Sequence, residues 1–438
     1  MATNPDGSVT EVTSEGWFSR VGGSFKGIGA GIVLALVAAG VLWWNEGRAV
    51  RTGDTLAEAQ QATIPMPSVE KFDPAFDGKL VHASGLATTT QTVSDPLFGV
   101  APPPPVLALE RRVEYYQWIE RSKSETKKKL GGGTETTTTY NYEAEWVKQP
   151  VDSTRFKNPQ GHDNTLRTAG VQLKNETFRP AQVSFGAYQL PDFLAGGINK
   201  SQAFAPAFTA EQLAALRTKL LPRGTSPGAA SVAIEKSASG AVEYLGSGGR
   251  VALSALMGET VKPQLLADGS LYIGQAADTP QPGDVRVRWL ATPAADVTII
   301  AKAAGNTFTK YTASNGNTFS SLAMGRKDMG EMFESARSGN TFFTWVLRAL
   351  GVGIAIGAFG LILAPLGVLA SVVPLLGAIV EAGTGLVATL LGVAWSLVII
   401  ALAWLRFRPL LAVVLLVIAV ALIATIFMLR RKRAAAAA

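Results

Sequence analysis

The sequence predicts an α+β membrane protein with an N-terminal transmembrane anchor, a β-rich extramembrane domain and a C-terminal bundle of three transmembrane helices. Three observations predict this fold class. Apolar residues concentrate at 27–44 and 343–429, at the two ends of the chain. Between them, residues 46–340 are polar, and several of their segments alternate apolar and polar side chains. Charged residues make up only 17% of the chain, below the share usual for soluble proteins.

The first 45 residues are expected to form a tail and an anchor. We expect residues 1–24 to be a cytoplasmic tail and residues 25–45 to be a transmembrane helix. Gly27–Trp44 carries no charge and would be about 27 Å long as a helix, just enough for a bilayer core of about 30 Å. A signal peptide is the rival interpretation, but this run ends in Trp-Trp-Asn-Glu instead of small residues. The segment is therefore interpreted as an uncleaved anchor.

The central domain is expected to be β-rich, with a few helices. Two segments alternate with period two, as half-buried strands do: YNYEAEW at 140–146 and VRVRW at 285–289. We expect RRVEYYQWIER, at 111–121, to pair with 140–146 as a long hairpin, with a bulge at the adjacent Tyr115 and Tyr116. Further strands are predicted at 79–87 and 295–303, and helices at 209–222 and 327–339. The first of these helices opens with a capping box, Thr209 and Gln212.

Residues 341–430 are expected to form the C-terminal transmembrane region. Its predicted spans are about 343–364, 383–405 and 409–429. Pro365 and Pro374 each discourage helix at the preceding residue, so an embedded or interfacial connector is predicted over 366–383. If that connector crosses the membrane, the chain has five spans instead of four. The lone acid Glu381 is expected to cap the third span at the inner membrane surface.

Basic and aromatic residues predict the orientation. Cytoplasmic ends carry an excess of Lys and Arg, so the basic run places the tail 431–438 inside and residues 46–340 outside. That run is Arg430, Arg431, Lys432 and Arg433. Four tryptophans fall at the outer end of a span, as an aromatic belt would: Trp43, Trp44, Trp345 and Trp404.

Composition excludes several kinds of chemistry. The 438-residue chain has no cysteine, which excludes disulfides, thiolate metal sites and a cysteine nucleophile. With only His82 and His162, a multi-histidine metal site is almost excluded. Both histidines are expected to be structural, His82 on a strand and His162 in a polar turn. The net charge of +7 is mild and forms no basic stripe, so we expect no nucleic-acid partner, and we expect neither a cofactor nor a bound metal.

Several long motifs occur in this order along the chain: WWNEGRAVRTGDTLAEA, GKLVHASGLATTTQTVSDPLFGV, RRVEYYQWIE, YNYEAEW, GDVRVRW and RFRPLLA. In these motifs the chain resembles the LUMA family, transmembrane protein 43. The similarity covers roughly residues 25–430, and its core motif is Asn45, Glu46, Gly47 and Arg48. The resemblance implies an N-terminal anchor, a large loop across the membrane and a cluster of C-terminal spans, without catalytic residues. An all-Ala tail, Ala-rich spans and the lack of cysteine suggest a bacterial member.

The family implies self-association, and in eukaryotes residence in the endoplasmic reticulum or inner nuclear membrane with lamin and emerin-type partners. A bacterial member would lie in the inner membrane, with a periplasmic central domain and no lamins to bind. We expect a non-enzymatic scaffold in the lipid bilayer that forms homo-oligomers, with other membrane proteins as further partners. The alternative is an oligomeric channel or transport subunit, which would need polar residues lining a span. A membrane-bound hydrolase is a third hypothesis, disfavoured because only two histidines are available.

Overall fold

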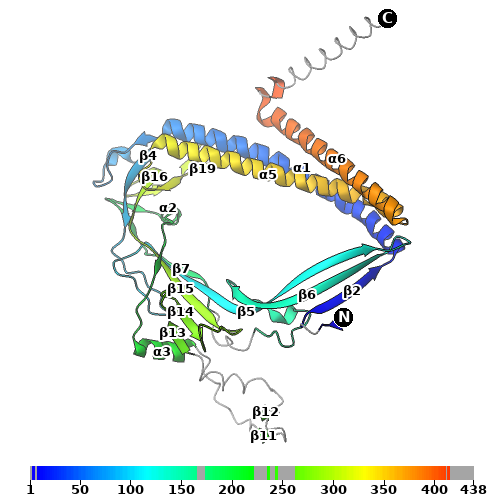
Figure 1. Cartoon of the computed structure of the whole chain (residues 1–438). Coiled ribbons are helices and arrows are strands. Elements are labelled where there is room, and N and C mark those ends of the chain that lie inside the picture. The colour runs from blue at the N-terminus through cyan, green and yellow to red at the C-terminus, as the bar shows by residue number, and fades with distance from the viewer. Residues whose placement is uncertain are drawn as a thin grey trace, which may run out of the picture.

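The computed structural model describes residues 2–4, 7–164, 173–220, 234–236, 242–244, 262–410 and 412–414. Its described part is α+β, with three long apolar helices and a β-rich middle (Figure 1). Most of the predicted span 409–429 and the whole basic run Arg430–Arg433 lie outside the described residues, as does the tail 431–438.

The three helices are each long and apolar enough to cross a membrane. They are α1 (Trp17–Ala62), α5 (Met329–Ala370) and α6 (Pro374–Phe407). α1 and α5 run antiparallel and side by side (Figure 1). Glycine allows this close approach: a Cβ added at Gly351 of α5 would lie 2.5 Å from Cδ2 of Leu42 on α1. Small residues commonly mediate such contacts between membrane helices.

The link between α5 and α6 is shorter than the sequence predicted. Instead of a connector over 366–383, only residues 371–373 separate the two helices. Pro365 lies inside α5, and Pro374 occupies the first turn of α6. Proline is well suited to a first helical turn because the N–H that it lacks has no partner there anyway. The helix predicted separately at 327–339 is likewise the beginning of α5, where Asp328 caps the N-terminus.

Two large sheets make up the central domain. The first has the path β1-β2-β6-β5-β15-β14-β13, with β7 on β5 and β10 on β15. Its strands are β1 (Ala2–Thr3), β2 (Val9–Glu15), β5 (Ala108–Lys128), β6 (Thr134–Val147), β7 (Glu176–Phe178), β10 (Gln202–Phe204), β13 (Lys262–Leu265), β14 (Leu271–Gly274) and β15 (Val285–Thr292).

The second sheet has the path β17-β16-β4-β8-β9, with β20 on β16 and β3 on β4. Its strands are β3 (Ile64–Pro65), β4 (Leu80–Thr88), β8 (Val183–Phe185), β9 (Tyr188–Leu190), β16 (Ala295–Ala304), β17 (Thr307–Thr309) and β20 (Ser321–Met324). Two small hairpins are β11 (Ile234–Lys236) with β12 (Val242–Tyr244), and β18 (Tyr311–Thr312) with β19 (Thr318–Phe319). Short helices are α2 (Asp192–Ala195) and α3 (Ala210–Leu220).

Most of the expected local structure is present. The predicted strands at 79–87 and 295–303 correspond to β4 and β16, which pair with each other. α3 has its capping box: the N–H of Gln212 donates to Oγ1 of Thr209 at 3.2 Å, and the N–H of Thr209 donates to Oε1 of Gln212 at 2.8 Å. The expected bulge is absent, because Tyr115 pairs with Val147 and the register continues without a break to Lys128.

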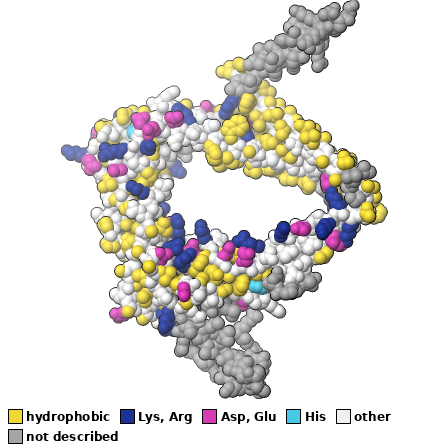
Figure 2. Space-filling model, viewed as in Figure 1, with side chains coloured by type: hydrophobic (Ala, Val, Ile, Leu, Met, Phe, Trp, Pro, Cys, Tyr) yellow, Lys and Arg dark blue, Asp and Glu magenta, His cyan; other side chains and the backbone are white. Residues whose placement is uncertain are grey.

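The hairpin β5–β6 and strand β2 extend away from the domain and meet the helices at the hairpin tip (Figure 1). Figure 2 shows an opening between this hairpin and the helices. Apolar side chains gather on the helical rim of the opening, and charged side chains gather on the hairpin rim. At the end near α5's C-terminus, the hairpin tip contacts the helices again.

At the opposite end, the domain packs directly on α1 and α5. Leu56 and Ala59 of α1 and Phe333 of α5 share one buried cluster with Leu80 of β4 and Ile300 of β16. The domain and the hairpin tip therefore contact opposite ends of the helices.

Candidate functional site

A buried ion pair joins all three long helices at the motif that carried the family resemblance. Glu46 of α1 is fully buried, with 0% of its surface exposed. Nε and Nη2 of Arg348, on α5, donate to its two carboxylate oxygens at 2.6 and 2.9 Å. The indole N–H of Trp404, on α6, donates to Oε2 of Glu46 at 2.8 Å. Because a buried charge is costly without partners, these contacts fix how the three helices meet.

Asn45 and Arg48 extend this contact toward the start of α5. The side-chain amide of Asn45 donates to the carbonyl oxygen of Thr344 at 3.0 Å. Arg48 donates to Oδ1 of Asn340 and Oγ1 of Thr344, each at 2.9 Å. Its Nε is buried and is the only side-chain atom of that kind, among the described residues, without a hydrogen-bond partner. The polar residues of the motif therefore act as a clamp between α1 and α5.

Gly47 allows α1 to approach the end of α6 closely. A Cβ at Gly47 would lie 2.8 Å from Cζ of Phe407, the last residue of α6. The ring of Phe407 also packs edge-on against Trp43, with centroids 5.6 Å apart. The motif Asn45–Arg48 is thus a structural junction of α1, α5 and α6, for which we name it the helix junction.

The four tryptophans predicted as an aromatic belt surround the helix junction to different degrees. The guanidinium of Arg348 lies over the rings of Trp345 and Trp404, at 4.8 and 5.8 Å from their centroids. Trp43 packs on Phe407, whereas Trp44 is largely exposed. The rings of Trp44 and Trp345 are exposed, as a position at the membrane interface requires. Their interfacial role stays a prediction.

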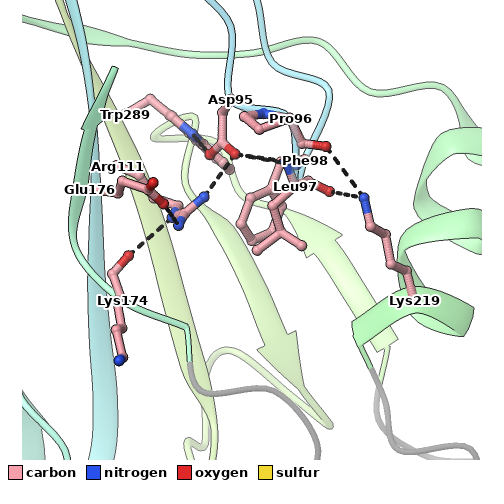
Figure 3. A network of polar contacts seen from close by, with 9 residues as sticks. All are labelled: Asp95, Pro96, Leu97, Phe98, Arg111, Lys174, Glu176, Lys219 and Trp289. Atoms are coloured by element: carbon pink, nitrogen blue, oxygen red, sulfur yellow. Dashed lines mark hydrogen bonds and ion pairs between the residues drawn. The ribbon is translucent and has the colours of Figure 1, made fainter. Parts of the chain in front are cut away.

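A second buried network lies inside the first sheet, and no pattern in the sequence predicts it (Figure 3). Asp95 is fully buried and accepts from Nη1 of Arg111 at 2.7 Å and from the indole N–H of Trp289 at 3.0 Å. Arg111 also donates to Glu176 at 2.6 Å and to the carbonyl oxygen of Lys174 at 3.1 Å. The sequence around Asp95 does not reveal this role, because its side-chain partners, Arg111 of β5 and Trp289 of β15, are remote in sequence.

This network fixes a loop to the sheet. Asp95 also accepts from the backbone N–H groups of Leu97 and Phe98. Lys219, near the end of α3, donates to the carbonyl oxygens of Pro96 and Leu97, at 3.3 and 2.9 Å (Figure 3). The loop is thereby held between α3 and β15, and the carboxylate is fully engaged in holding it.

The two histidines make structural contacts. His82 contacts the carbonyl oxygen of Lys327 at 2.9 Å through Nε2. His162 stacks on Tyr142, with centroids 4.0 Å apart, and its Nδ1 lies 3.0 Å from the carbonyl oxygen of Asn158. Burial, followed by a hydrogen bond to Glu120, raises the pKa of Tyr142 to about 12. No group of three or more metal-ligating side chains forms among the described residues.

The hairpin tip forms a third polar contact region, which we call the tip junction. The indole N–H of Trp17, at the start of α1, donates to the carbonyl oxygen of Val368 on α5 at 3.0 Å. Arg20 donates to the carbonyl oxygen of Gly132 and, at 3.2 Å, to Oγ of Ser371. The amide of Gly131 donates to the carbonyl oxygen of Val372 at 3.2 Å.

Glu381 belongs to the same region. Its carboxylate forms an ion pair with Lys128, at the end of β5. Glu381 stands out in the sequence because it is the one acid in a long apolar stretch. Its partner is 253 positions away in the sequence, so local patterns gave no means of finding it.

Comparison with known proteins identifies related sequences. A family model described as transmembrane protein 43 matches residues 115–409. Transmembrane protein 43 from Rattus norvegicus is 28% identical over 407 residues, which cover 93% of this chain and 91% of the relative. The Homo sapiens protein of that name is 26% identical over 412 residues, with coverages of 93% and 91%.

A shorter match is found in Drosophila melanogaster. Its transmembrane protein 43 homolog is 33% identical over 138 residues, or 31% of this chain and 36% of the relative. No solved structure gives a significant match. Because the family model spans more than half of the sequence, and full-length relatives align over almost all of it, this chain belongs to the transmembrane protein 43 family.

Proposed function

We propose that this protein is a non-enzymatic membrane scaffold that self-associates and organises membrane or protein complexes. The observation that carries the proposal is the attachment of the β domain to the long helices at both of their ends. At one end Leu56 and Phe333 pack on the domain, and at the other the tip junction holds the hairpin. Such double attachment would hold a large β surface at a fixed position relative to the bilayer.

The use of polar side chains supports a structural role. The most buried carboxylates, those of Glu46 and Asp95, are each held by an arginine and an indole N–H. Both histidines contact backbone carbonyl oxygens. These groups position elements of the fold, which is what a scaffold requires of them.

We propose that the protein lies in the inner membrane as a multi-pass protein, with the domain of residues 46–340 mainly in the periplasm and the run Arg430–Arg433 in the cytoplasm. In a eukaryotic cell the corresponding places would be the endoplasmic reticulum and the inner nuclear membrane. The support is the excess of basic residues at the C-terminal end and the three candidate spans.

A channel or transport subunit is a second candidate, favoured by one observation. The half of the hairpin β5–β6 nearer the tip is polar on both faces, and Figure 2 shows its charged rim across an opening from the apolar helices. The helical spans carry too few polar residues to line a water-filled passage by themselves. A polar hairpin close to them supplies the groups that a water-filled passage needs.

Cross-linking in native membranes, followed by mass measurement of the protein in lipid nanodiscs, tests the proposal. A scaffold of this kind is expected to give one discrete oligomeric mass that cross-linking reproduces. A monomeric mass at all concentrations would overturn self-association. Ion flux into liposomes containing the purified protein separates the two candidates, because a scaffold leaves the liposomes tight and a channel makes them permeable.

A further inference from the structure

The hairpin passes the part of the helices that is apolar enough to lie in lipid. The domain packs at Leu56 and Ala59 of α1, whereas the hairpin tip contacts Trp17. The apolar run 27–44 lies between these two positions. From Trp17 to Asn45 the helix rises about 42 Å, and from Tyr115 to Lys128 an extended strand covers about 44 Å. If α1 crosses a bilayer, β5, β6 and β2 lie at membrane depth.

The half of these strands nearer the tip, residues 11–15, 121–128 and 134–141, cannot face lipid. Paired residues share a face, so the register places Glu11, Ser124, Thr126 and Lys128 on one face. There, Ser124 and Thr126 form hydroxyl hydrogen bonds with Thr138 and Thr136, each of 2.9 Å. The other face carries Lys123, Glu125 and Lys127, with Val12 as an isolated apolar residue. Lipid-exposed strands need an apolar outer face, and neither face qualifies.

The backbone at this depth also has open edges. β6 is the central strand and pairs with β2 on one side and β5 on the other. In the described part of the chain, no further strand pairs with residues 11–15 of β2 or 121–128 of β5. Unpaired backbone groups are very costly in a bilayer unless water or protein meets them. One copy cannot join its own two edges, because three strands are too few to close into a barrel.

We propose that β2 of one copy pairs with β5 of the next, so that several copies close a polar barrel within a ring of their apolar helices. The inference rests on the self-association proposed above and names the surface that produces it. The junction would be parallel, because β2 and β5 both run antiparallel to β6. Opposite charges favour it: the open stretch of β2 carries Glu11 and Glu15, and that of β5 carries a lysine excess.

Near the tip, both faces of such a barrel would be polar. One face carries the serine and threonine hydroxyls and Lys128, which pairs with Glu381 of α6. The other face carries Lys123, Glu125 and Lys127. Whichever face turns inward, the barrel encloses a polar passage that suits small hydrated ions. A barrel of this kind would account for a channel without requiring polar residues on the membrane helices.

The first test asks whether the hairpin crosses the membrane. The natural chain has no cysteine, so each single cysteine variant reports one position. Leu130→Cys at the tip (88% exposed) and Phe72→Cys in the domain (48% exposed) would be treated with a charged maleimide in sealed vesicles of both orientations. We expect the two sites to react from opposite sides. Reaction of both from the same side would overturn the inference.

The second test locates the junction by disulfide formation between copies. Val12→Cys would be combined in turn with Lys123→Cys, Glu125→Cys and Lys127→Cys, which share its face. Within one copy Val12 and Glu125 flank Thr137, about 9.6 Å apart, which is beyond disulfide reach. Any disulfide therefore joins two copies, and we expect at least one pair to give a ladder of multimers.

Because side chains alternate between the two faces of the sheet, a pair on opposite faces supplies the matched control. Val12→Cys with Ser124→Cys places the two thiols on opposite faces, so this pair should not cross-link. Equal cross-linking of this control, or of Val12→Cys alone, would contradict the proposed junction. The native mass of the same samples separates the hypotheses: an oligomer without any of the disulfides overturns the barrel only, whereas a monomer overturns self-association as well.

Discussion

At the residue scale, buried carboxylates in this protein connect elements that are remote in sequence. Asp95 links a loop to β5 and β15 through Arg111 and Trp289. Glu46 links α1 to α5 and α6 in the same manner, through Arg348 and Trp404. In each case the ion pair is accompanied by an indole N–H, which satisfies a lone pair that the arginine leaves free. A buried carboxylate is tolerated when hydrogen bonds and an ion pair satisfy its oxygen atoms in this way.

Replacing Asp95 should reveal the cost of leaving Arg111 without its main partner. Asp95→Asn keeps the shape but removes the charge, and we expect it to lower the free energy of unfolding by about 3–5 kcal/mol. Denaturant unfolding followed by tryptophan fluorescence measures this. Glu110→Gln, which removes an ion pair of β5 that is partly exposed to solvent, is the control and should cost about 1 kcal/mol or less. Equal effects would refute the assigned role.

Asp268 is expected to make stability depend on pH. Hydrogen bonds from the hydroxyl and N–H of Ser270, then the charge of Arg288, lower the pKa of the Asp268 carboxyl. A lowered folded-state pKa contributes stability above the unfolded value of about 4, and this contribution is lost as the pH falls further. Asp268→Asn should therefore lower Tm at about pH 7, and this effect should shrink steadily as the pH falls below about 4. An effect on Tm that stays undiminished throughout that acid range would disprove this.

At the element scale, the tip junction decides where the hairpin ends. Gly132 has φ of +81° and contacts the ring of Trp17, so that an added Cβ would overlap the indole. Gly131 has a similar φ of +86° but nothing within 4 Å of the position of a Cβ. The two glycines therefore separate backbone strain from steric overlap.

Gly132→Ala should release the tip from the helices. We expect trypsin to cleave faster after Lys127, Lys128 or Lys129 in this variant than in the natural protein, because the strands would separate from α1. Gly131→Ala shares the backbone strain without the overlap, and should show a clearly smaller increase. Mass spectrometry of timed digests gives the rates. Identical acceleration in both variants would show that strain, not the contact with Trp17, controls the tip.

Local signals predicted elements well wherever they were self-contained. The capping box of α3 and the alternation in β15 needed only neighbouring residues, and both are present as expected. The prolines were misleading, because Pro365 is accommodated inside α5 and Pro374 begins α6. β2 lies within residues 1–24, which are expected from the sequence to form a tail, and its sequence VTEVTSE is mostly polar. Only its pairing with β6, more than a hundred residues away in the sequence, makes it a strand.

At the scale of the whole molecule, the helix junction holds the three long helices in one arrangement. Glu46→Gln or Arg348→Met alone leaves a charge without its partner, and each should cost about 3–5 kcal/mol. The double variant removes both charges, so it should cost less than the sum of the single variants. Thermal inactivation of the protein in nanodiscs, scored as loss of the native mass, is the measurement. Strict additivity would show that the pair is not coupled.

The sequence by itself determined the parts of this protein that depend on composition and short-range pattern. It determined the apolar helices, the β-rich middle, the family resemblance and the motif at Asn45–Arg48, because bilayer thickness and side-chain periodicity act on contiguous residues. Only the tertiary structure decided that Glu46 meets Arg348, that Lys128 meets Glu381 and that β2 joins β6. Those contacts join residues more than a hundred positions apart, and no local pattern encodes which distant charge or strand edge a segment will meet.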